Sequence, residues 1–244
     1  MIYFISDIHL GLKIRNEDRK IEDLLIAFLE KITADVETLV IVGDLFDYWF
    51  DYKTVIPKSF YRILAAIDKL VRSGVKIEYI IGNHDFGHSR FFREEFGIEP
   101  HFHDIEREYY GKKFYISHGD GKSNKDTGYK FLKKILRNSL NQKLYRMIHP
   151  DWGIGLASRS SRKSRNYTDK KNYGEADGMT QFAERKIDEG YDYVVMGHRH
   201  KLIEEHYKDG IYFNLGEWIN NPHFLRFDGN SFTFESVRSF LSNQ

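Results

Sequence analysis

The chain has 244 residues and nearly balanced charge, with 37 Lys or Arg against 36 Asp or Glu and a formal net charge of +1. This length is enough for one sizeable domain, or for a core domain with an insertion. No apolar stretch approaches the roughly 20 residues that cross a bilayer, and Met1 leads straight into an apolar run, so we expect neither a membrane-spanning segment nor a signal peptide. The absence of cysteine excludes disulfides and is typical of a reducing compartment, so we expect a cytoplasmic protein.

Five short apolar runs, rich in β-branched and aromatic residues, predict buried strands. These runs are Ile2–Ile5, Thr38–Val42, Ile77–Ile81, Lys113–Ile116 and Tyr193–Met196. A polar cluster follows each run, and together the five clusters dominate the chemistry of the chain. In chain order they are Asp7-Ile8-His9, Gly43-Asp44-Leu45-Phe46-Asp47, Gly82-Asn83-His84-Asp85, His118-Gly119-Asp120 and Gly197-His198-Arg199-His200.

The position of these clusters predicts that they share one site, because loops at the carboxyl ends of strands in an α/β sheet open into one crevice. Carboxylates mixed with imidazoles suit Mn, Fe or Zn better than Mg alone. The clusters hold too many ligands for one ion, so the sequence predicts a two-metal hydrolytic centre. Taken singly, each motif is ordinary turn chemistry, and His118 alone would be an unremarkable buried histidine. Five such coincidences at five strand ends argue against a purely structural explanation.

The ordered motifs D-x-H, G-D-x-x-D, G-N-H-D, H-G-D and G-H-x-H, from Asp7 to His200, resemble the calcineurin-like metallophosphoesterase superfamily. The resemblance implies an α/β fold of two facing mixed β-sheets flanked by helices, an αββα sandwich, with two metals at the sheet ends. Asp44 and a water or hydroxide would bridge the ions. The implied ligands are Asp7, His9, Asp44 and His200 for one ion, and Asp44, Asn83, His118 and His198 for the other. Further predicted strands at residues 202–206, 211–214, 225–227 and 232–234 are expected to complete the second sheet.

By the same analogy His84, beside the ligand Asn83, would be catalytic. It would stabilise the transition state or protonate the leaving oxygen, and a purely structural histidine is the alternative. Asp47 and Asp85 are expected to orient the ligating imidazoles.

A strongly basic segment separates the fourth motif from the fifth. From Lys122 to Lys171 the chain has fourteen Lys or Arg and three Asp, so this segment carries +11 and the remainder carries −10. Apolar residues recur at helical spacing among the basic ones, as at Leu144, Met147 and Ile148. We therefore expect residues 122–171 to form a basic amphipathic helical cap, inserted into a core of residues 1–121 and 172–244.

Such a cap has three interpretations. It contacts a membrane surface and admits a lipid, it binds the backbone of a nucleic acid, or it is a solvated basic face. The interleaving of apolar and basic residues favours the first, because an acyl chain then has a place to go. We expect peripheral association with a membrane, and we do not expect nucleic acid as a partner.

The insertion and the end of the chain carry a narrower resemblance. His118-Gly119-Asp120, residues 126–129, the basic stretch from Arg159 to Lys171 and the turn Gly216-Glu217-Trp218 are similar to UDP-2,3-diacylglucosamine hydrolases. The resemblance implies cleavage of the pyrophosphate of UDP-2,3-diacylglucosamine to 2,3-diacylglucosamine 1-phosphate and UMP, in lipid A biosynthesis at the inner membrane. Two divalent ions, usually Mn²⁺, would serve as cofactors.

This resemblance also implies substrate contacts, at Asn83, Asp126, Tyr129, Ser164 and Lys171. Asp126 would equally serve as a helix N-cap, Tyr129 as packing within the cap, and Ser164 and Lys171 as exposed surface residues. One departure stands out: well-known members of the family have Arg where this chain has His84. His84 restores the pattern shared with phosphatases and nucleases, so the alternative function is a phosphodiesterase or phosphatase that acts on a soluble nucleotide or nucleic acid.

Overall fold

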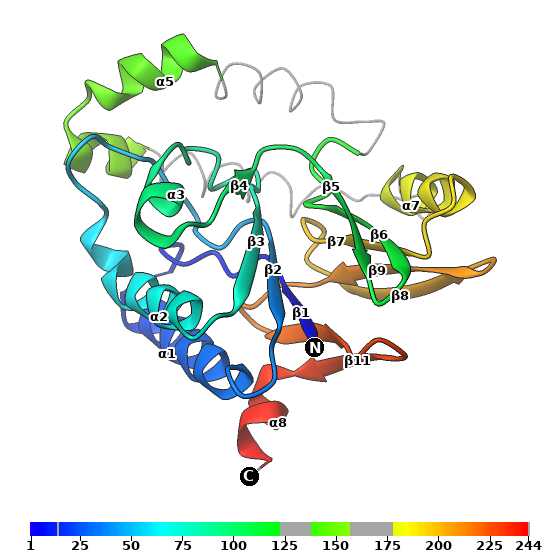
Figure 1. The fold of residues 1–244 in the computed structure, drawn as a ribbon. Coiled ribbons are helices and arrows are strands. Elements are labelled where there is room, and N and C mark those ends of the chain that lie inside the picture. The colour runs from blue at the N-terminus through cyan, green and yellow to red at the C-terminus, as the bar shows by residue number, and fades with distance from the viewer. Residues whose placement is uncertain (14, 123–137, 157–177, 244) are drawn as a thin grey trace.

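The computed structural model describes residues 1–13, 15–122, 138–156 and 178–243. These residues form four layers, in which helices cover the outer faces of a six-stranded and a five-stranded sheet (Figure 1). The expected α/β architecture of two facing mixed sheets flanked by helices is therefore confirmed. Within the described ranges, no helix combines the length and apolar character that crossing a membrane requires.

The first sheet has the strand order β11-β10-β1-β2-β3-β4. Its parallel part consists of β1 (Ile2–Ile5), β2 (Thr38–Val42), β3 (Lys76–Ile80) and β4 (Pro100–His101). The antiparallel strands β10 (His223–Phe227) and β11 (Phe232–Ser236) extend it beyond β1. β1 and β2 are buried along their whole length because both faces of this sheet are covered, which is why they appear in the sequence as continuous apolar runs.

The second sheet has the order β5-β6-β7-β9-β8. Its centre is parallel, with β6 (Lys112–Ser117), β7 (Tyr193–Met196) and β9 (Gly210–Leu215), and its edge strands β5 (Ile105–Tyr109) and β8 (Leu202–Tyr207) run antiparallel. Only β8 and β9 of the four strands predicted after His200 belong here. The expectation that all four complete this sheet is wrong, because β10 pairs with β1 in the first sheet. That pairing joins opposite ends of the chain, and no local pattern specifies it.

Alternation along each strand divides the apolar residues between two cores. In β1, Ile2 and Phe4 point between the sheets, whereas Tyr3 and Ile5 pack against the helices. Phe114 and Phe213 of the second sheet meet the inner residues of the first, and Phe4 stacks on Phe114 with ring centroids 5.8 Å apart. The inter-sheet core thus fixes how the carboxyl ends of the two sheets face each other.

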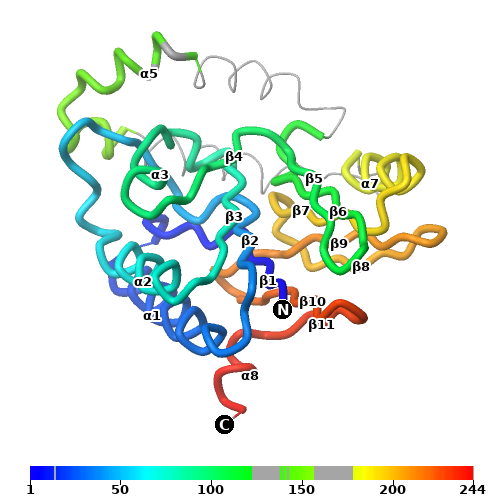
Figure 2. The backbone as a smooth tube through the Cα atoms, in the orientation of Figure 1, coloured from blue at the N-terminus to red at the C-terminus, as the bar shows by residue number. Residues whose placement is uncertain are grey.

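Helices cover both outer faces. α1 (Arg15–Ile32), α2 (Tyr61–Arg72) and α8 (Val237–Ser242) pack on the first sheet, and α7 (Gly178–Asp188) packs on the second. The short η1 (Lys58–Phe60) and α3 (Phe91–Phe96) lie in the connections of the first sheet. The buried residues of α2 recur on one helical face, as the spacing of Ile63, Ile67 and Leu70 requires. The tube in Figure 2 ends at the C-terminus just beyond α8.

The described part of the expected cap, residues 138–156, is anchored to the core at the loop that follows β2. It contains α5 (Ser139–Arg146), which begins after the N-cap Asn138, whose side chain accepts a hydrogen bond from Leu140 N at 2.9 Å. The rings of Tyr145 and Phe50 lie 4.5 Å apart, and Arg146 Nε donates to the carbonyl of Asp51 at 3.1 Å. Figures 1 and 2 both show this segment beside that loop.

A buried carboxylate ties the two sheets together at one edge. Glu78 of β3 accepts hydrogen bonds from Arg107 of β5 at 2.9 and 3.0 Å and lies 2.7 Å from His101 Nε2, and Lys76 Nζ lies 2.6 Å from its Oε1. Burial by itself raises the pKa of Glu78, but these partners outweigh burial and hold the pKa below its ordinary value. The ion pairs therefore stabilise the fold above the unfolded-state pKa near 4.5, and this contribution is lost as the pH falls toward the folded-state pKa.

We expect Glu78→Gln to lower the free energy of unfolding at pH 7 by about 1–3 kcal/mol, because three partly exposed cationic partners lose a buried, charged acceptor. The variant should also lose part of the decline in stability between pH 5 and pH 3. Urea unfolding at several pH values measures both effects. Glu30→Gln, which removes the exposed pair with Lys69, is the matched control and should cost less than about 1 kcal/mol. Equal losses in the two variants would contradict this account.

Candidate metal centre

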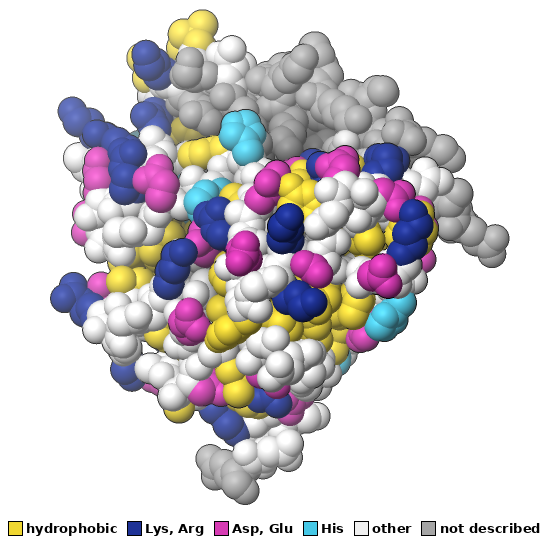
Figure 3. Space-filling view, turned by 45° about the vertical axis from the view of Figure 1, so that its right-hand side comes forward, with side chains coloured by type: hydrophobic (Ala, Val, Ile, Leu, Met, Phe, Trp, Pro, Cys, Tyr) yellow, Lys and Arg dark blue, Asp and Glu magenta, His cyan; other side chains and the backbone are white. Residues whose placement is uncertain are grey.

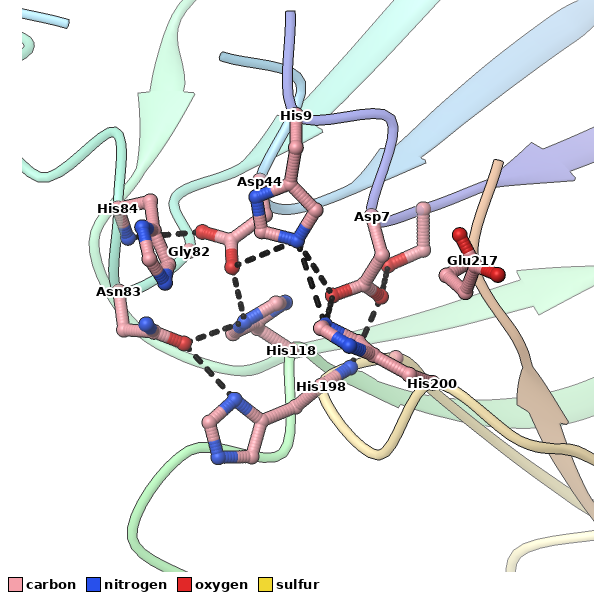
Figure 4. Close-up of polar contacts among 12 residues, drawn as sticks. Asp7, His9, Asp44, Gly82, Asn83, His84, His118, His198, His200 and Glu217 are labelled. Carbon is pink, nitrogen blue, oxygen red and sulfur yellow. Dashed lines mark hydrogen bonds and ion pairs between the residues drawn. The ribbon is translucent and has the colours of Figure 1, made fainter. Parts of the chain in front are cut away.

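The structure brings all seven predicted ligands together at the carboxyl ends of β1, β2, β3, β6 and β7, as Figure 4 shows. They come from five loops that are far apart in sequence, and they meet where the two sheets face each other. The seven residues are Asp7, His9, Asp44, Asn83, His118, His198 and His200.

The carboxylate of Asp7 has one oxygen fixed by the fold and one oxygen facing the cluster. Its Oδ2 accepts hydrogen bonds from the Ser6 hydroxyl at 2.5 Å and from His198 N at 2.9 Å. Its Oδ1 lies 3.6 Å from His9 Nε2 and 3.3 Å from His200 Nε2. Oδ1 is buried and accepts no hydrogen bond from any residue that the structure describes. A buried carboxylate oxygen that accepts no hydrogen bond requires a cation or proton nearby.

Asp44 is arranged in the same way. Its Oδ1 accepts a hydrogen bond from His84 N at 2.8 Å, so Oδ2 is directed between two histidines. Oδ2 lies 3.8 Å from His9 Nε2 and 3.3 Å from His118 Nε2. Because His9 belongs to one predicted ion and His118 to the other, this position agrees with a bridging role for Asp44.

The other half of the cluster is centred on the Asn83 amide oxygen, which lies 3.0 Å from His118 Nε2 and 2.8 Å from His198 Nδ1. His118 Nδ1 lies 2.8 Å from the carbonyl of Val42, which can only accept, so this nitrogen carries a proton. Nε2 of the neutral imidazole then presents a lone pair to the cluster, as a metal ligand must.

Among the residues that the structure describes, three groups of side chains have potential ligand atoms within 4.8 Å of one another, and these groups overlap. They are Asp7, His9 and His200; Asp7, Asp44 and His118; and His9, Asp44 and His84. Carboxylate and imidazole donors that converge from all sides suit divalent transition metals. The donor set therefore fits a dinuclear metal site, in which Asp44 would be shared by the two halves.

Backbone conformation marks the same residues. Among the described residues other than glycine, seven have positive φ angles, and five of these seven are predicted ligands. The φ angles are 54° at Asp7, 53° at His9, 53° at Asp44, 67° at His198 and 58° at His200. Left-handed backbone costs a side-chain-bearing residue about 1–2 kcal/mol and concentrates at functional sites. The sequence does not reveal these positive φ angles, because aspartate and histidine do not require a left-handed backbone.

Two glycines permit the close approach of the ligand loops. A Cβ atom on Gly82 would lie 2.0 Å from Asp44 Oδ1, and one on Gly197 would lie 2.0 Å from the Ser6 hydroxyl. Neither position leaves room for a side chain without moving a candidate ligand or the group that holds it. The glycines before Asn83 and His198 are therefore packing requirements of the cluster itself.

His84, the predicted catalytic residue, lies at the edge of the cluster. Its side chain is 13% exposed, and its Nδ1 lies 3.3 Å from the Asp47 carbonyl and 3.5 Å from Asp47 Oδ1. Asp47 Oδ1 also lies 3.7 Å from His9 Nδ1, which agrees with an orienting role. The same expectation for Asp85 is wrong, because the hydrogen bonds of its carboxylate come from two backbone N–H groups and a tyrosine rather than from an imidazole.

The remaining predicted substrate contacts fall outside the described residues. Asp126, Tyr129, Ser164 and Lys171 belong to residues 123–137 and 157–177, so only Asn83 of that set is placed.

The profile of the calcineurin-like phosphoesterases matches residues 1–202. The chain therefore belongs to this family of hydrolases, which binds metals in a dinuclear site. A UDP-2,3-diacylglucosamine hydrolase from Porphyromonas gingivalis is 33% identical over 97% of this chain and 97% of its own length. A relative of the same name from Neisseria meningitidis is 29% identical over 98% of both chains. A solved archaeal phosphodiesterase has a TM-score of 0.48 at 17% identity, over 96% of this chain and 98% of that chain. The narrower resemblance inferred from the motifs is confirmed.

Charge in the cluster predicts pH-dependent metal binding. Burial by itself lowers the pKa of His118, but the Asp44 carboxylate outweighs burial and raises it to about 10. Without a cation, His118 therefore carries an extra proton at neutral pH. A metal that takes Nε2 must displace this proton, so metal affinity should rise with pH.

We expect the affinity for Mn²⁺ to increase by up to about tenfold per pH unit between pH 6 and pH 8, since one released proton corresponds to about 1.4 kcal/mol per pH unit. Calorimetry in buffers with different ionisation enthalpies measures both the affinity and the number of protons released. An affinity that stays constant across this range, with no proton release, would contradict the assignment of His118 as a ligand.

Proposed function

We propose that the protein is a metal-dependent hydrolase that cleaves the pyrophosphate of UDP-2,3-diacylglucosamine to 2,3-diacylglucosamine 1-phosphate and UMP, in lipid A biosynthesis. The observation that carries the proposal is the convergence of all seven predicted donors. It occurs in a chain that aligns, over almost its full length, with relatives of this enzyme name. The convergence supports phosphoester or phosphoanhydride hydrolysis. The relatives support the choice of the lipid-linked nucleotide over a soluble nucleotide or nucleic acid.

In this proposal each half of the cluster holds one ion, and the mixture of carboxylate and imidazole donors favours Mn²⁺. Asp7, His9, Asp44 and His200 would hold one ion, and Asp44, Asn83, His118 and His198 would hold the other. Two divalent cations supply a nucleophile at neutral pH and neutralise the charge that develops on the phosphoryl oxygens. The chain's own contribution is to fix donor geometry, through Ser6 and through backbone groups that bind the outer carboxylate oxygens.

His84 is proposed to act by charge rather than as an acid. The leaving group of a pyrophosphate is itself a phosphate, whose second pKa lies near 6, so it needs little protonation at neutral pH. A positive charge beside the departing oxygens is still valuable. The contact of Nδ1 with the Asp47 carbonyl holds the ring at the cluster edge and leaves Nε2 for the substrate. An arginine could supply the same charge from this position.

The test is release of UMP, measured by mass spectrometry, from UDP-2,3-diacylglucosamine and Mn²⁺. We expect the native chain to release UMP and Asp44→Asn to lose activity and metal together. His84→Ala should keep the metals but lower kcat by about 10²–10³, the usual effect of losing one transition-state donor. His84→Arg should remain within about tenfold of the native protein.

Two outcomes would contradict these proposals. Turnover of soluble nucleotides or aryl phosphodiesters without any UMP from the lipid would support the alternative function. An inactive His84→Arg beside a fully active His84→Ala would remove the electrostatic role.

The outer surface of residues 138–156 supports the proposed membrane partner. Leu140, Leu144 and Met147 follow one another at helical spacing and are 62%, 55% and 83% exposed, and Trp152 is 76% exposed. Lys143 and Arg146 belong to the same helix. Exposed apolar and basic side chains stand together at the top of the view in Figure 3, whereas acidic and basic side chains are mixed over the face below. This combination matches a helix that lies in an anionic lipid surface. We therefore propose peripheral association with the inner membrane.

Tryptophan fluorescence tests this proposal directly. Trp49 and Trp218 are each 1% exposed, so a blue shift on adding vesicles that contain an anionic lipid reports on Trp152. We expect this shift in the native chain and its loss in Met147→Glu. Leu202→Glu, at an exposed leucine of β8 in the second sheet, is the matched control and should bind vesicles normally. Equal binding by Met147→Glu and the native chain would exclude this helix as the contact.

A further inference from the structure

A buried carboxylate connects the two loops that carry Asp44 and Asn83. Asp85 is fully buried, and its Oδ1 accepts a hydrogen bond from Gly82 N at 2.7 Å. Its Oδ2 accepts one from Leu45 N at 3.1 Å. Leu45 directly follows Asp44, and Gly82 directly precedes Asn83. A single side chain therefore sets the distance between the loop of the bridging carboxylate and the loop of the amide ligand.

The orientation of that carboxylate depends on Tyr79. The Tyr79 hydroxyl, on the helix-facing side of β3, donates to Asp85 Oδ2 at 2.6 Å. His88 Nε2 lies 3.2 Å from the same hydroxyl oxygen. Because the hydroxyl has a single proton and a carboxylate can only accept, His88 must donate from Nε2 to Tyr79. The hydrogen bonds therefore run in one direction, from His88 to Tyr79 to Asp85 and on to the ligand loops.

The start of this chain of hydrogen bonds is itself held firmly. His88 is 2% exposed and stacks on Trp49, with ring centroids 5.3 Å apart and planes 12° from parallel. Trp49 Nε1 donates to Asp51 at 2.5 Å. The other carboxylate oxygen of Asp51 accepts from the backbone N–H groups of Ser89, Arg90 and Phe91 at the start of α3. Burial lowers the pKa of His88 to about 3, so its ring is neutral at pH 7.

We propose that Tyr79 and His88 are positioning residues of the metal centre, which act through Asp85 to hold Asp44 and Asn83 at the separation that two cations need. This inference rests on the proposed dinuclear centre. Neither residue touches the ligand cluster, so both act at a distance through hydrogen bonds. Groups that orient ligands in this way commonly contribute 10- to 100-fold to metal affinity.

The protein offers a matched control. Tyr3 lies in the same sheet, faces the same helices, is equally buried, and donates its hydroxyl proton to Asp35 at 3.0 Å. Asp35 follows the end of α1 and belongs to none of the ligand loops. Tyr79→Phe and Tyr3→Phe therefore each keep a buried ring and remove a hydrogen bond to an aspartate, which is buried for Tyr79 and exposed for Tyr3. A purely structural role would lower the stability of both variants and leave the Mn²⁺ affinity of both unchanged.

Calorimetric titration of the metal-free protein with Mn²⁺, together with thermal unfolding, tests the proposal. We expect the native chain and Tyr3→Phe to bind two Mn²⁺ with equal affinity. Tyr79→Phe should bind at least one of the two ions tenfold or more weakly at a temperature well below its own metal-free melting temperature. Unchanged binding of both ions by Tyr79→Phe would overturn the proposal.

A second pair of variants serves if Tyr79→Phe does not fold. His88→Gln keeps an N–H near the position of Nε2, and His88→Phe removes it. We expect His88→Phe to bind Mn²⁺ more weakly than His88→Gln, and equal affinities would overturn the proposal. A native chain that binds fewer than two Mn²⁺ would instead overturn the dinuclear centre itself, which distinguishes the two failures.

Discussion

The position of the Asp44 carboxylate is the constraint on which the rest of the site depends. One oxygen is held by the backbone of the β3 loop, and the other is presented between His9 and His118. Burying this group beside Asp7 is costly unless cations balance the charge. In their absence the histidines take that role, which is why the pKa of His118 is raised while the pKa values of Asp7 and Asp44 are held down. The fold thus maintains an electrostatic environment that divalent metals would complete.

Maintaining that environment requires strain, and the surrounding architecture offsets it. Five candidate ligands adopt left-handed backbone, at about 1–2 kcal/mol each, a sum comparable to the net stability of a typical domain. The loops are short and follow strands whose last residues are buried, so they cannot relax without disturbing the sheets. The inter-sheet core and the Glu78 ion pairs fix the two sheets relative to each other. The contacts that fix the two sheets therefore lie behind the site, and they hold in place donors that would otherwise move apart.

The charge distribution complements this arrangement. The metal-binding core is acidic overall and the segment from Lys122 to Lys171 is strongly basic. The described part of that segment packs on Phe50 and Asp51, only a few residues beyond Asp44. A lipid-linked nucleotide has an apolar part and a doubly charged pyrophosphate, which would suit these two regions respectively. The proposed substrate has one part for each region. Neither region alone would require a substrate with both parts.

The sequence by itself determined which side chains are the candidate donors and which strands carry them. Continuous apolar runs such as Thr38–Val42 predict buried strands, and the geometry of α/β sheets then places the polar residues beyond each strand at one edge. The sequence did not reveal β5, whose Ile-Glu-Arg-Glu-Tyr pattern reflects a half-exposed edge strand, or the return of β10 to pair with β1. Only the tertiary structure decided the left-handed backbone of the ligands and the path from His88 through Tyr79 to Asp85. Both depend on contacts between distant loops, and such contacts leave no periodic signal in the chain.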